Sequence, residues 1–391
     1  MEPRILVLDG NQRASLAAVR SLGSKGLWVA VGESSTVSLA GFSRFCNTSV
    51  TYPDPFSSPR LFFEAILQRI QELGISFLLP ITEATTYALL QYRDELPEEV
   101  ILPFSADQSV EQLANKNELF KLAQTLNVPI PETEFCQSVD EGLKALDTLN
   151  NYPLVLKPYK SKILQGDSIL STEVSVVRSR EEATTVLKKY PYFDFPFTIQ
   201  SFIEGGGQGI FALFDHGEPV CYFAHKRLRE KPPGGGVSVL CESAPVDQAL
   251  KDAADKLLRS VMWHGVAMVE FRVSKNGCGY LMEVNPRFWG SLQLAIDSGF
   301  DFPWWLYMVS TGQPVPQASW QHRRMRWLLG DLDRLYLVLK APTSTYSMAE
   351  KFIEILRFLK PGLRTRHEVN RWHDLRPFWF ELKQYILALR H

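Results

Sequence analysis

Residues 266–290 read VAMVEFRVSKNGCGYLMEVNPRFWG, and this stretch decides the fold of the chain. Apolar residues gather in two short runs, 266–273 and 280–284, so we expect two strands. Asn276-Gly277 stands between the runs, and both residue types tolerate the positive φ that tight hairpin turns require. The stretch therefore predicts a β-hairpin.

Each predicted strand carries one carboxylate among apolar neighbours, Glu270 on the first and Glu283 on the second. Asn285 follows Glu283 by two residues, and side chains two apart on a strand point to the same face. Three oxygen donors on adjacent strands suit a hard cation such as Mg2+, which keeps water and phosphate in its remaining positions. The sequence thus predicts a Mg2+ site, with Mn2+ as an alternative ion. The competing interpretation is a buried strand pair whose acids form salt bridges.

Glu270 together with the run EVNPR at 283–287 resembles the metal-binding end of the ATP-grasp superfamily. The motif EVNPRFWGS is most similar to the carbamoyl-phosphate-synthase-like and amino-acid-ligase branches, and the resemblance extends over residues 106–310. It implies an ATP-grasp fold with ATP and Mg2+ as cofactors. It also implies a catalytic role for Arg287 beside the transferring phosphoryl group.

The length and composition are those of a multidomain globular protein. A chain of 391 residues exceeds one ordinary hydrophobic core and predicts two or three domains. The net charge of −1 gives no general case for binding nucleic acid. The five cysteines lack zinc-like spacing, the N-terminus leads into a strand without a signal peptide, and no apolar run reaches a membrane span. We therefore expect a reduced, cytoplasmic setting.

The order of expected elements divides the chain into four parts, which are 1–105, 106–196, 197–316 and 317–391. Alternating strands and helices in the first part predict a Rossmann-like parallel sheet, with helices that end at Gly23 and Gly74. The fold class is therefore α/β, with α+β character in the nucleotide-binding part. In the ATP-grasp superfamily such a leading domain often contributes to the pocket for the acceptor substrate.

Two lysines are candidates for the phosphates of ATP. Lys116 leads a helix before the turn VPIP at 128–131, and in the superfamily the lysine at this place contacts nucleotide phosphates. Without that resemblance Lys116 would be a solvated surface lysine. Lys157 ends the buried strand in YPLVLKP, which fixes a cation where phosphate oxygens can bind. In the superfamily this lysine binds the α- and β-phosphates.

Two further segments resemble nucleotide-binding parts of the superfamily. The loop at 159–168 departs from the pattern, because relatives carry several glycines and only Gly166 remains, but Lys162 can still cover the phosphates. The run FTIQSFIEG at 197–205 resembles the hinge that reads adenine through its main chain, and its alternative is a simple edge strand with a glycine-rich turn. The hinge candidates for ATP binding are Gln200, Ser201, Ile203 and Glu204, the last for the ribose hydroxyls.

Residues 225–236 read HKRLREKPPGGG, in which basic residues precede prolines and a glycine run. This composition is typical of a mobile loop. In relatives the region places basic side chains near the γ-phosphate and the acyl phosphate, so Arg227 and Arg229, together with Lys226, are candidates for that catalytic role. The alternative is a solvated run of charges.

The segment 317–391 differs from the rest of the chain in charge. It holds fourteen Lys/Arg against seven Asp/Glu, a net charge of +7, and it carries four of the nine tryptophans. Phe352, Leu356 and Leu359 share one side of an expected helix. We expect a helical extension whose apolar stripe packs on the body of the protein. The alternative is a basic aromatic surface for a membrane, a lipid-linked substrate or a partner.

Taken with the resemblance, these residues predict an ATP-dependent ligase that joins a small-molecule carboxylate to an amine through an acyl phosphate. Lys116 and Lys157 would hold phosphates, and Mg2+ would lie on Glu270, Glu283 and Asn285. One alternative is an enzyme that activates bicarbonate as carboxyphosphate, and another is a nucleotide-binding regulatory protein without turnover. We expect no nucleic-acid partner, and we leave open a homodimer.

Overall fold

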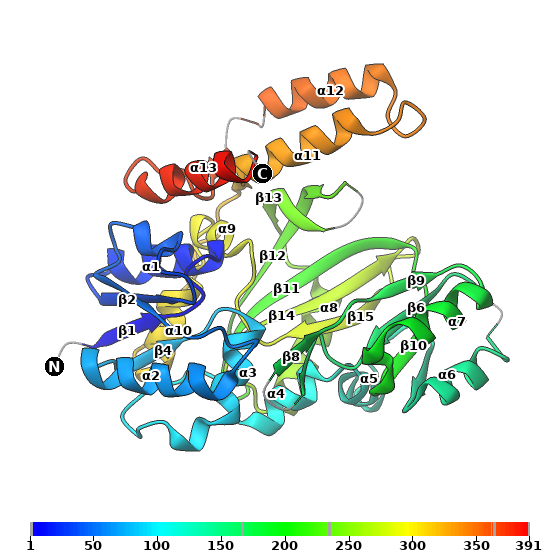
Figure 1. Ribbon diagram of the computed structural model, residues 1–391, viewed down its shortest axis with the longest axis horizontal. Coiled ribbons are helices and arrows are strands. Elements are labelled where there is room, and N and C mark those ends of the chain that lie inside the picture. The colour runs from blue at the N-terminus through cyan, green and yellow to red at the C-terminus, as the bar shows by residue number, and fades with distance from the viewer. Residues whose placement is uncertain are drawn as a thin grey trace.

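The computed structural model describes residues 3–149, 151–165, 168–233, 236–360, 362 and 365–389. Gly166 of the predicted phosphate-covering loop, and Gly234 and Gly235 of the predicted basic loop, lie outside these residues. In Figure 1 a parallel-sheet domain lies at the left and a smaller lobe at the right, with a large sheet between them and the C-terminal helices above it.

The N-terminal domain is built on a parallel sheet in the order β3-β2-β1-β4. Its strands are β1 (Arg4–Val7), β2 (Trp28–Glu33), β3 (Thr48–Thr51) and β4 (Phe77–Leu79). Ile5 and Val7 of β1 pack with α1 (Arg13–Ser24), whereas Leu6 packs with α2 (Pro59–Leu73) and α3 (Glu83–Gln91). Alternate residues of a strand point to opposite faces, so helices cover both sides of the sheet. The predicted parallel sheet is confirmed.

One of the two predicted glycine stops is correct. Gly74 follows α2 with φ +62, and its N–H donates to Ile70 O. By contrast, α1 continues through Gly23 to Ser24, so the predicted stop at Gly23 is wrong. A Cβ on Gly23 would lie 2.9 Å from Phe45 O. That glycine therefore permits a close backbone approach and does not end the helix.

The small lobe holds an antiparallel sheet in the order β5-β10-β6-β9. Its core is formed by apolar residues such as Leu156, Phe193 and Phe197. A separate hairpin, β7–β8, extends from this lobe. The strands are β5 (Thr133–Cys136), β6 (Leu154–Pro158), β7 (Lys162–Gln165), β8 (Ser168–Ser171), β9 (Ser175–Val177) and β10 (Phe197–Ser201), and the helices are α4 (Asp107–Ala114), α5 (Lys116–Thr125), α6 (Val139–Ala145) and α7 (Arg180–Lys189).

The large sheet has the order β15-β14-β11-β12-β13-β16-β17. Helix α8 (Gln248–Ser260) covers one face, whereas α9 (Leu292–Asp297) and α10 (Phe302–Ser310) lie on the other and pack against α1. The hairpin predicted at 266–290 is confirmed as β14–β15, and Gly277 in its turn has φ +85. The strands are β11 (Gly205–Asp215), β12 (Glu218–Lys231), β13 (Val237–Ala244), β14 (Gly265–Ser274), β15 (Gly279–Asn285), β16 (Arg324–Arg326) and β17 (Thr365–His367).

The C-terminal extension contains α11 (Leu328–Lys340), α12 (Met348–Leu359) and α13 (Arg376–Ala388). It is not purely helical, because β16 and β17 add two strands to the edge of the large sheet. Strands of three residues are too short to give an alternating sequence pattern. The extension also docks on the N-terminal domain, where the buried Arg20 donates to Asp374 at 2.8 Å. Short 3₁₀ helices lie elsewhere at η1 (Ala40–Phe42), η2 (Arg93–Glu95) and η3 (Pro191–Asp194).

The predicted packing of the α12 stripe is wrong. Phe352, Leu356 and Leu359 are exposed, and the side of α12 that faces inward carries the buried Glu354. Glu354 accepts hydrogen bonds from Arg334 and Arg357, each at 2.7 Å. These ion pairs fix the helix with its charged side inward, which the apolar spacing alone did not indicate.

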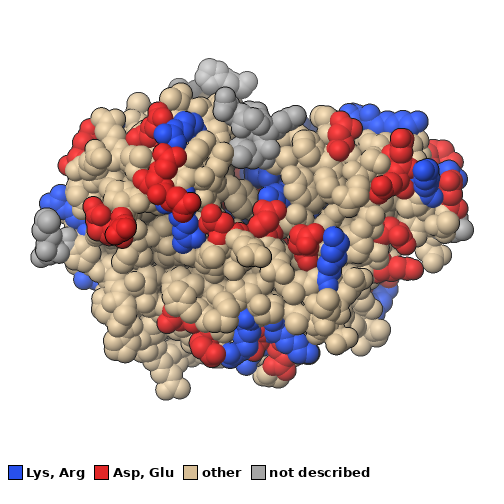
Figure 2. Space-filling model, turned by 90° about the horizontal axis from the view of Figure 1, so that it is seen from below, with Lys and Arg blue, Asp and Glu red and all other residues tan. Residues whose placement is uncertain are grey.

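Charges are distributed in mixed patches on the face seen from below. Figure 2 shows Lys and Arg interspersed there with Asp and Glu, in keeping with the net charge of −1. Within the described part of the chain, no helix is long and apolar enough to cross a membrane.

Candidate active site

Two carboxylates face each other across the β14–β15 hairpin. Glu270 and Glu283 are direct partners in the antiparallel register, so their side chains point to the same face of the sheet. Asn285 lies two residues further along β15, and its Nδ2 donates to Glu283 Oε1 at 3.1 Å. The fold thus brings together the three side chains that the sequence placed at a metal site.

Burial and neighbouring charges give the two carboxylates different proton affinities. Burial raises the pKa of Glu270, and the charge of Glu283 raises it further, to about 7. Burial also opposes the charged form of Glu283. Lys116, the Asn285 amide and Lys157 outweigh that cost, however, and hold the pKa of Glu283 below its usual value. The proton therefore binds more readily to Glu270 than to Glu283.

Lys116 and Lys157 reach the carboxylates from the small lobe. Lys116 begins α5, where its N–H donates to Tyr159 O at 2.7 Å, and its Nζ lies 3.5 Å from Glu283 Oε2. Lys157 near the end of β6 is 7% exposed, and its Nζ lies 3.7 Å from Met282 Sδ. Burial lowers the pKa of Lys157 to about 8, with Glu283 opposing the shift and Lys116 adding to it. Two fixed cations therefore flank the carboxylate pair.

Two arginines also contact this cluster. Arg227 Nη2 lies 3.8 Å from Glu270 Oε2. Arg287 Nη2 donates to Asn285 Oδ1 at 3.2 Å, and its Nε lies 3.4 Å from Glu83 Oε1. Cations so placed can neutralise charge that develops on a transferring phosphoryl group.

Arg229 is not brought to the carboxylates. Arg227 pairs with Cys241 and Arg229 with Leu240, so two residues of β12 oppose one residue of β13. This bulge turns Arg229 to the face opposite Arg227. There its Nη2 lies 3.0 Å from Oδ2 of the buried Asp331, in an ion pair between β12 and α11.

The donor set fits Mg2+. Glu270 and Glu283 offer carboxylate oxygens, the ligands that hard cations prefer. A divalent ion between them would offset the burial and the repulsion from Glu283 that together raise the pKa of Glu270. Asn285 turns its amide NH2 toward Glu283, so an ion held by both residues requires the amide oxygen on that side. Such an ion would neutralise phosphate charge when bound.

The predicted adenine hinge lies at the end of β10. Ser201 N–H donates to Glu132 O at 2.9 Å and Phe202 N–H to Pro153 O at 3.3 Å, so these two donors are already used. Ile203 N–H has no backbone partner among the described residues, which leaves it available to a base.

The two polar side chains of the hinge have separate positions. Gln200 is buried, and its Nε2 donates to Thr133 Oγ1 at 2.8 Å, which holds β10 to β5. Glu204 is exposed and pairs with Lys275 at 2.9 Å. Gln200 therefore supports the hinge from inside the small lobe, whereas the exposed Glu204 could exchange its Lys275 partner for a ribose.

A cavity of about 480 Å³ opens between the N-terminal domain, the β7–β8 hairpin and the segment after β15. Arg287, Glu83 and Trp289 line it, together with Lys162, whose Nζ donates to Ser171 Oγ at 2.9 Å. The cavity lies beyond the carboxyl ends of β1 and β4, where open α/β sheets bind ligands. Sequence reasoning missed Glu83 and Trp289. The position of Glu83 just after a parallel strand was the available signal.

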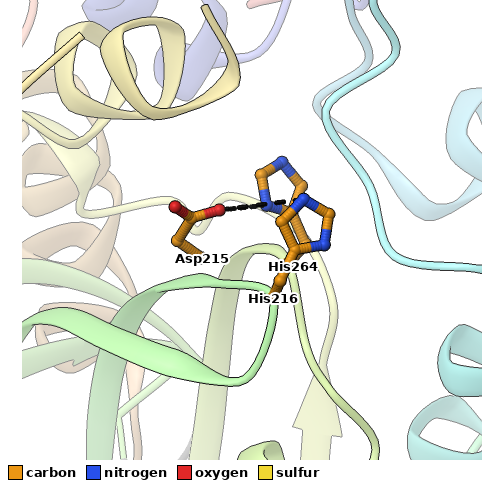
Figure 3. A group of neighbouring side chains, drawn as sticks. All are labelled: Asp215, His216 and His264. Atoms are coloured by element: carbon orange, nitrogen blue, oxygen red, sulfur yellow. Dashed lines mark hydrogen bonds and ion pairs between the residues drawn. The ribbon is translucent and has the colours of Figure 1, made fainter. Parts of the chain in front are cut away.

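A second group of titratable side chains lies at the tip of the β11–β12 hairpin (Figure 3). Asp215 Oδ1 lies 3.2 Å from His264 Nδ1, and the rings of His216 and His264 stack at 4.4 Å. Gly209 of β11 is paired with Glu270, and Asp215 lies six residues further along the same strand. At the rise of a β-strand this separation places the group roughly 20 Å from the carboxylates. Burial lowers the pKa of His264, and its bond to Asp215 ties the hairpin tip to the start of β14. These residues are therefore separate from the carboxylate pair.

The fold and the site together define a class of protein. A parallel-sheet domain precedes a small α+β lobe and a large antiparallel sheet, and two carboxylates of that sheet face lysines of the lobe. This arrangement is the ATP-grasp fold, which solved structures share over most of the chain. The family model described as ATP-grasp in the biosynthetic pathway with Ter operon matches residues 199–328.

Individual relatives resemble parts of the chain. The arginine-specific large chain of carbamoyl phosphate synthase from Bacillus subtilis (strain 168) is 23% identical over 186 residues, which are 46% of this chain and 17% of that protein. The chain thus corresponds to less than a fifth of this longer relative.

Solved structures share the fold over most of the chain. An L-amino acid ligase from Bacillus licheniformis has a TM-score of 0.58 at 18% identity, covering 79% of this chain and 74% of that one. An N5-carboxyaminoimidazole synthetase from Staphylococcus aureus has a TM-score of 0.64 at 14% identity, covering 88% and 86%. A biotin carboxylase domain from Hydrogenobacter thermophilus, solved with MgADP and bicarbonate, has a TM-score of 0.62 at 12% identity, covering 81% and 71%.

Proposed function

We propose that the protein is an ATP-dependent ligase that activates a substrate carboxylate as an acyl phosphate and joins it to an amine. The observation that carries this proposal is the position of Arg287. Its guanidinium contacts Asn285 of the carboxylate cluster and also lines the 480 Å³ cavity. A substrate carboxylate bound in the cavity would therefore lie beside phosphates held at the hairpin.

The reaction needs no side-chain nucleophile. A substrate carboxylate oxygen attacks the γ-phosphorus, the bond to the β–γ bridging oxygen breaks, and ADP leaves. The amine nitrogen then attacks the acyl carbon, loses a proton, and inorganic phosphate departs. Lys116 and Lys157 would hold the phosphates of ATP, while Arg227 and Arg287 would neutralise the transferring group.

A second candidate is activation of bicarbonate as carboxyphosphate. The names of several relatives support it, because they include carboxylases and carbamoyl phosphate synthase, and one structure was solved with MgADP and bicarbonate. The same cations would serve, since bicarbonate is itself a small carboxylate-like anion. The two candidates differ in what occupies the cavity beside Arg287.

Substrate-dependent turnover distinguishes the candidates. Phosphate release from ATP and Mg2+ would be measured over a panel of amino acids and other carboxylates, each with hydroxylamine to capture an acyl phosphate as its hydroxamate. We expect release and hydroxamate with one class of carboxylate. ADP formation that depends on bicarbonate alone would establish the second candidate. Tight ATP binding without turnover on any substrate would contradict both.

A further inference from the structure

The amphipathic helix α12 turns its apolar side to solvent. A helix of a globular protein ordinarily buries its apolar stripe and exposes its charged side. Here Glu354 faces inward, where it is buried against Arg334, and it also pairs with the exposed Arg357 at the edge of this side. The exposed fractions on the opposite side are 72% for Met348, 60% for Phe352, 45% for Leu356 and 66% for Leu359.

Several contacts fix this orientation. Lys351 Nζ donates to Leu339 O at 2.9 Å and to Ala341 O, which closes the end of α11 against the start of α12. The Arg326 guanidinium lies 4.1 Å from the centre of the Phe358 ring, on the inward side. The outward position of the apolar residues therefore follows from polar contacts on several residues.

Two tryptophans elsewhere in the extension are also exposed. Trp372 is 94% exposed and Trp379 on α13 is 61% exposed. Figure 1 places α11, α12 and α13 together on the side of the molecule opposite α4 and α5. The outer apolar face is defined here as the α12 residues Met348, Phe352, Leu356 and Leu359.

In the extension most acidic side chains are buried or half-buried, whereas many basic side chains are exposed. Of its acids, Asp331, Glu354, Glu368 and Asp374 are buried, and only Glu350 is fully exposed among the described residues of 317–391. Its exposed cations, by contrast, are Lys340, Arg357, Lys360, Arg366, Arg376 and Lys383. The buried acids pair with arginines such as Arg20, Arg229 and Arg334. The exposed charged side chains among the described residues are therefore six cations and one acid, and two of the cations, Arg357 and Lys360, lie at the C-terminal end of α12 next to the outer apolar face.

We propose that the outer apolar face docks on an anionic lipid bilayer. Aromatic and aliphatic side chains surrounded by Lys and Arg are the pattern of an interfacial surface, in which apolar groups enter the headgroup boundary and cations meet lipid phosphates. A second copy of this chain is a poorer occupant, because face-to-face contact would oppose two positively charged surfaces. The proposal is independent of the reaction and of the carboxylate cluster.

The test uses the full chain and sedimentation with two kinds of vesicle. One is phosphatidylcholine alone, and the other is equal parts phosphatidylcholine and phosphatidylglycerol. We expect binding to the anionic vesicles, release at high salt, and no binding to phosphatidylcholine. The double variant Phe352→Ser/Leu356→Ser should bind the anionic vesicles at least about tenfold more weakly than the wild type. Lys340→Glu/Lys360→Glu should show the same loss.

Matched controls separate docking from misfolding. Leu61→Ser on α2 replaces a leucine that is similarly exposed but distant in the fold, and it should leave vesicle binding unchanged. All variants should keep the wild-type affinity for an ATP analogue, since none touches the nucleotide site. The proposal is overturned by absent vesicle binding, by undiminished binding of both double variants, or by a wild-type dimer that Phe352→Ser/Leu356→Ser converts to a monomer.

Discussion

Replacement of Lys157 by methionine should weaken ATP binding and stabilise the empty protein at the same time. The Lys157 ammonium is buried beside the Phe120 ring and the thioether of Met282. Methionine has an unbranched stem of similar size and suits such an apolar site. The substitution therefore removes the charge with little change in packing.

The two effects have comparable magnitudes. Loss of a charge-assisted hydrogen bond to phosphate costs about 1.5–3 kcal/mol, which is roughly 10- to 150-fold in the dissociation constant for ATP. The pKa of Lys157 falls from 10.5 to about 8 on folding. That shift corresponds to a destabilisation on the order of 3 kcal/mol at neutral pH, which Lys157→Met would remove. The variant without nucleotide should therefore unfold at a higher temperature than the wild type.

The pH dependence has a defined sign. Because the folded pKa of Lys157 lies below its unfolded value, the unfolded chain binds more protons between about pH 8 and 10.5, and this group makes stability rise with pH across that window. Wild-type affinity for ATP should fall about tenfold from pH 7 to 9 as the ammonium loses its proton. Lys157→Met should lack both dependences.

Calorimetric titration with a non-hydrolysable ATP analogue and thermal unfolding without ligand measure the two effects. Lys121→Met is the matched control, because Lys121 is an exposed lysine on α5 and its replacement should change neither quantity. Undiminished affinity of Lys157→Met, or a lower unfolding temperature, would refute the assignment of Lys157 as a buried phosphate ligand.

Three further predictions concern the metal site, the diverted arginine and the extension. Glu283→Gln should keep the fold but lower Mg2+-dependent ATP turnover by about 100-fold or more, and full turnover in a folded variant would exclude the metal assignment. Arg229→Gln should lower the free energy of unfolding by about 3 kcal/mol in a denaturant titration, because Asp331 loses a buried partner. Its affinity for the ATP analogue should be unchanged, and weakened analogue binding would instead favour a catalytic role for Arg229. A chain ending at Pro316 should be less stable by several kcal/mol, since it loses the acceptors of Arg20 at Glu368, Val369 and Asp374. Thermal unfolding with light scattering measures this, and a shortened protein that stayed folded and monodisperse would contradict it.

Local sequence patterns predicted much of the site. The β14–β15 hairpin followed from its alternating apolar residues and from Gly277. Strand alternation then placed Glu270, Glu283 and Asn285 on one face. Lys157 was predictable because it ends a buried strand. These features depend on residues close together in the chain, and the resemblance to a known superfamily related them to one another.

Contacts between distant segments decided the rest. An added residue in β12 relative to β13 places the Arg229 side chain on the opposite face of the sheet from Arg227. No sequence pattern within residues 225–236 predicts this bulge. Glu83 met Arg287 only because the N-terminal domain closes on the segment after β15.

The orientation of α12 shows the same division between sequence and structure. Its sequence determined that the helix is amphipathic, because Phe352, Leu356 and Leu359 recur at helical spacing. It did not determine which side faces inward. Arg334 on α11 decided that by pairing with Glu354 at 2.7 Å. Periodicity defines the two sides of a helix, whereas the side that is buried depends on the charges and surfaces that tertiary folding brings against it.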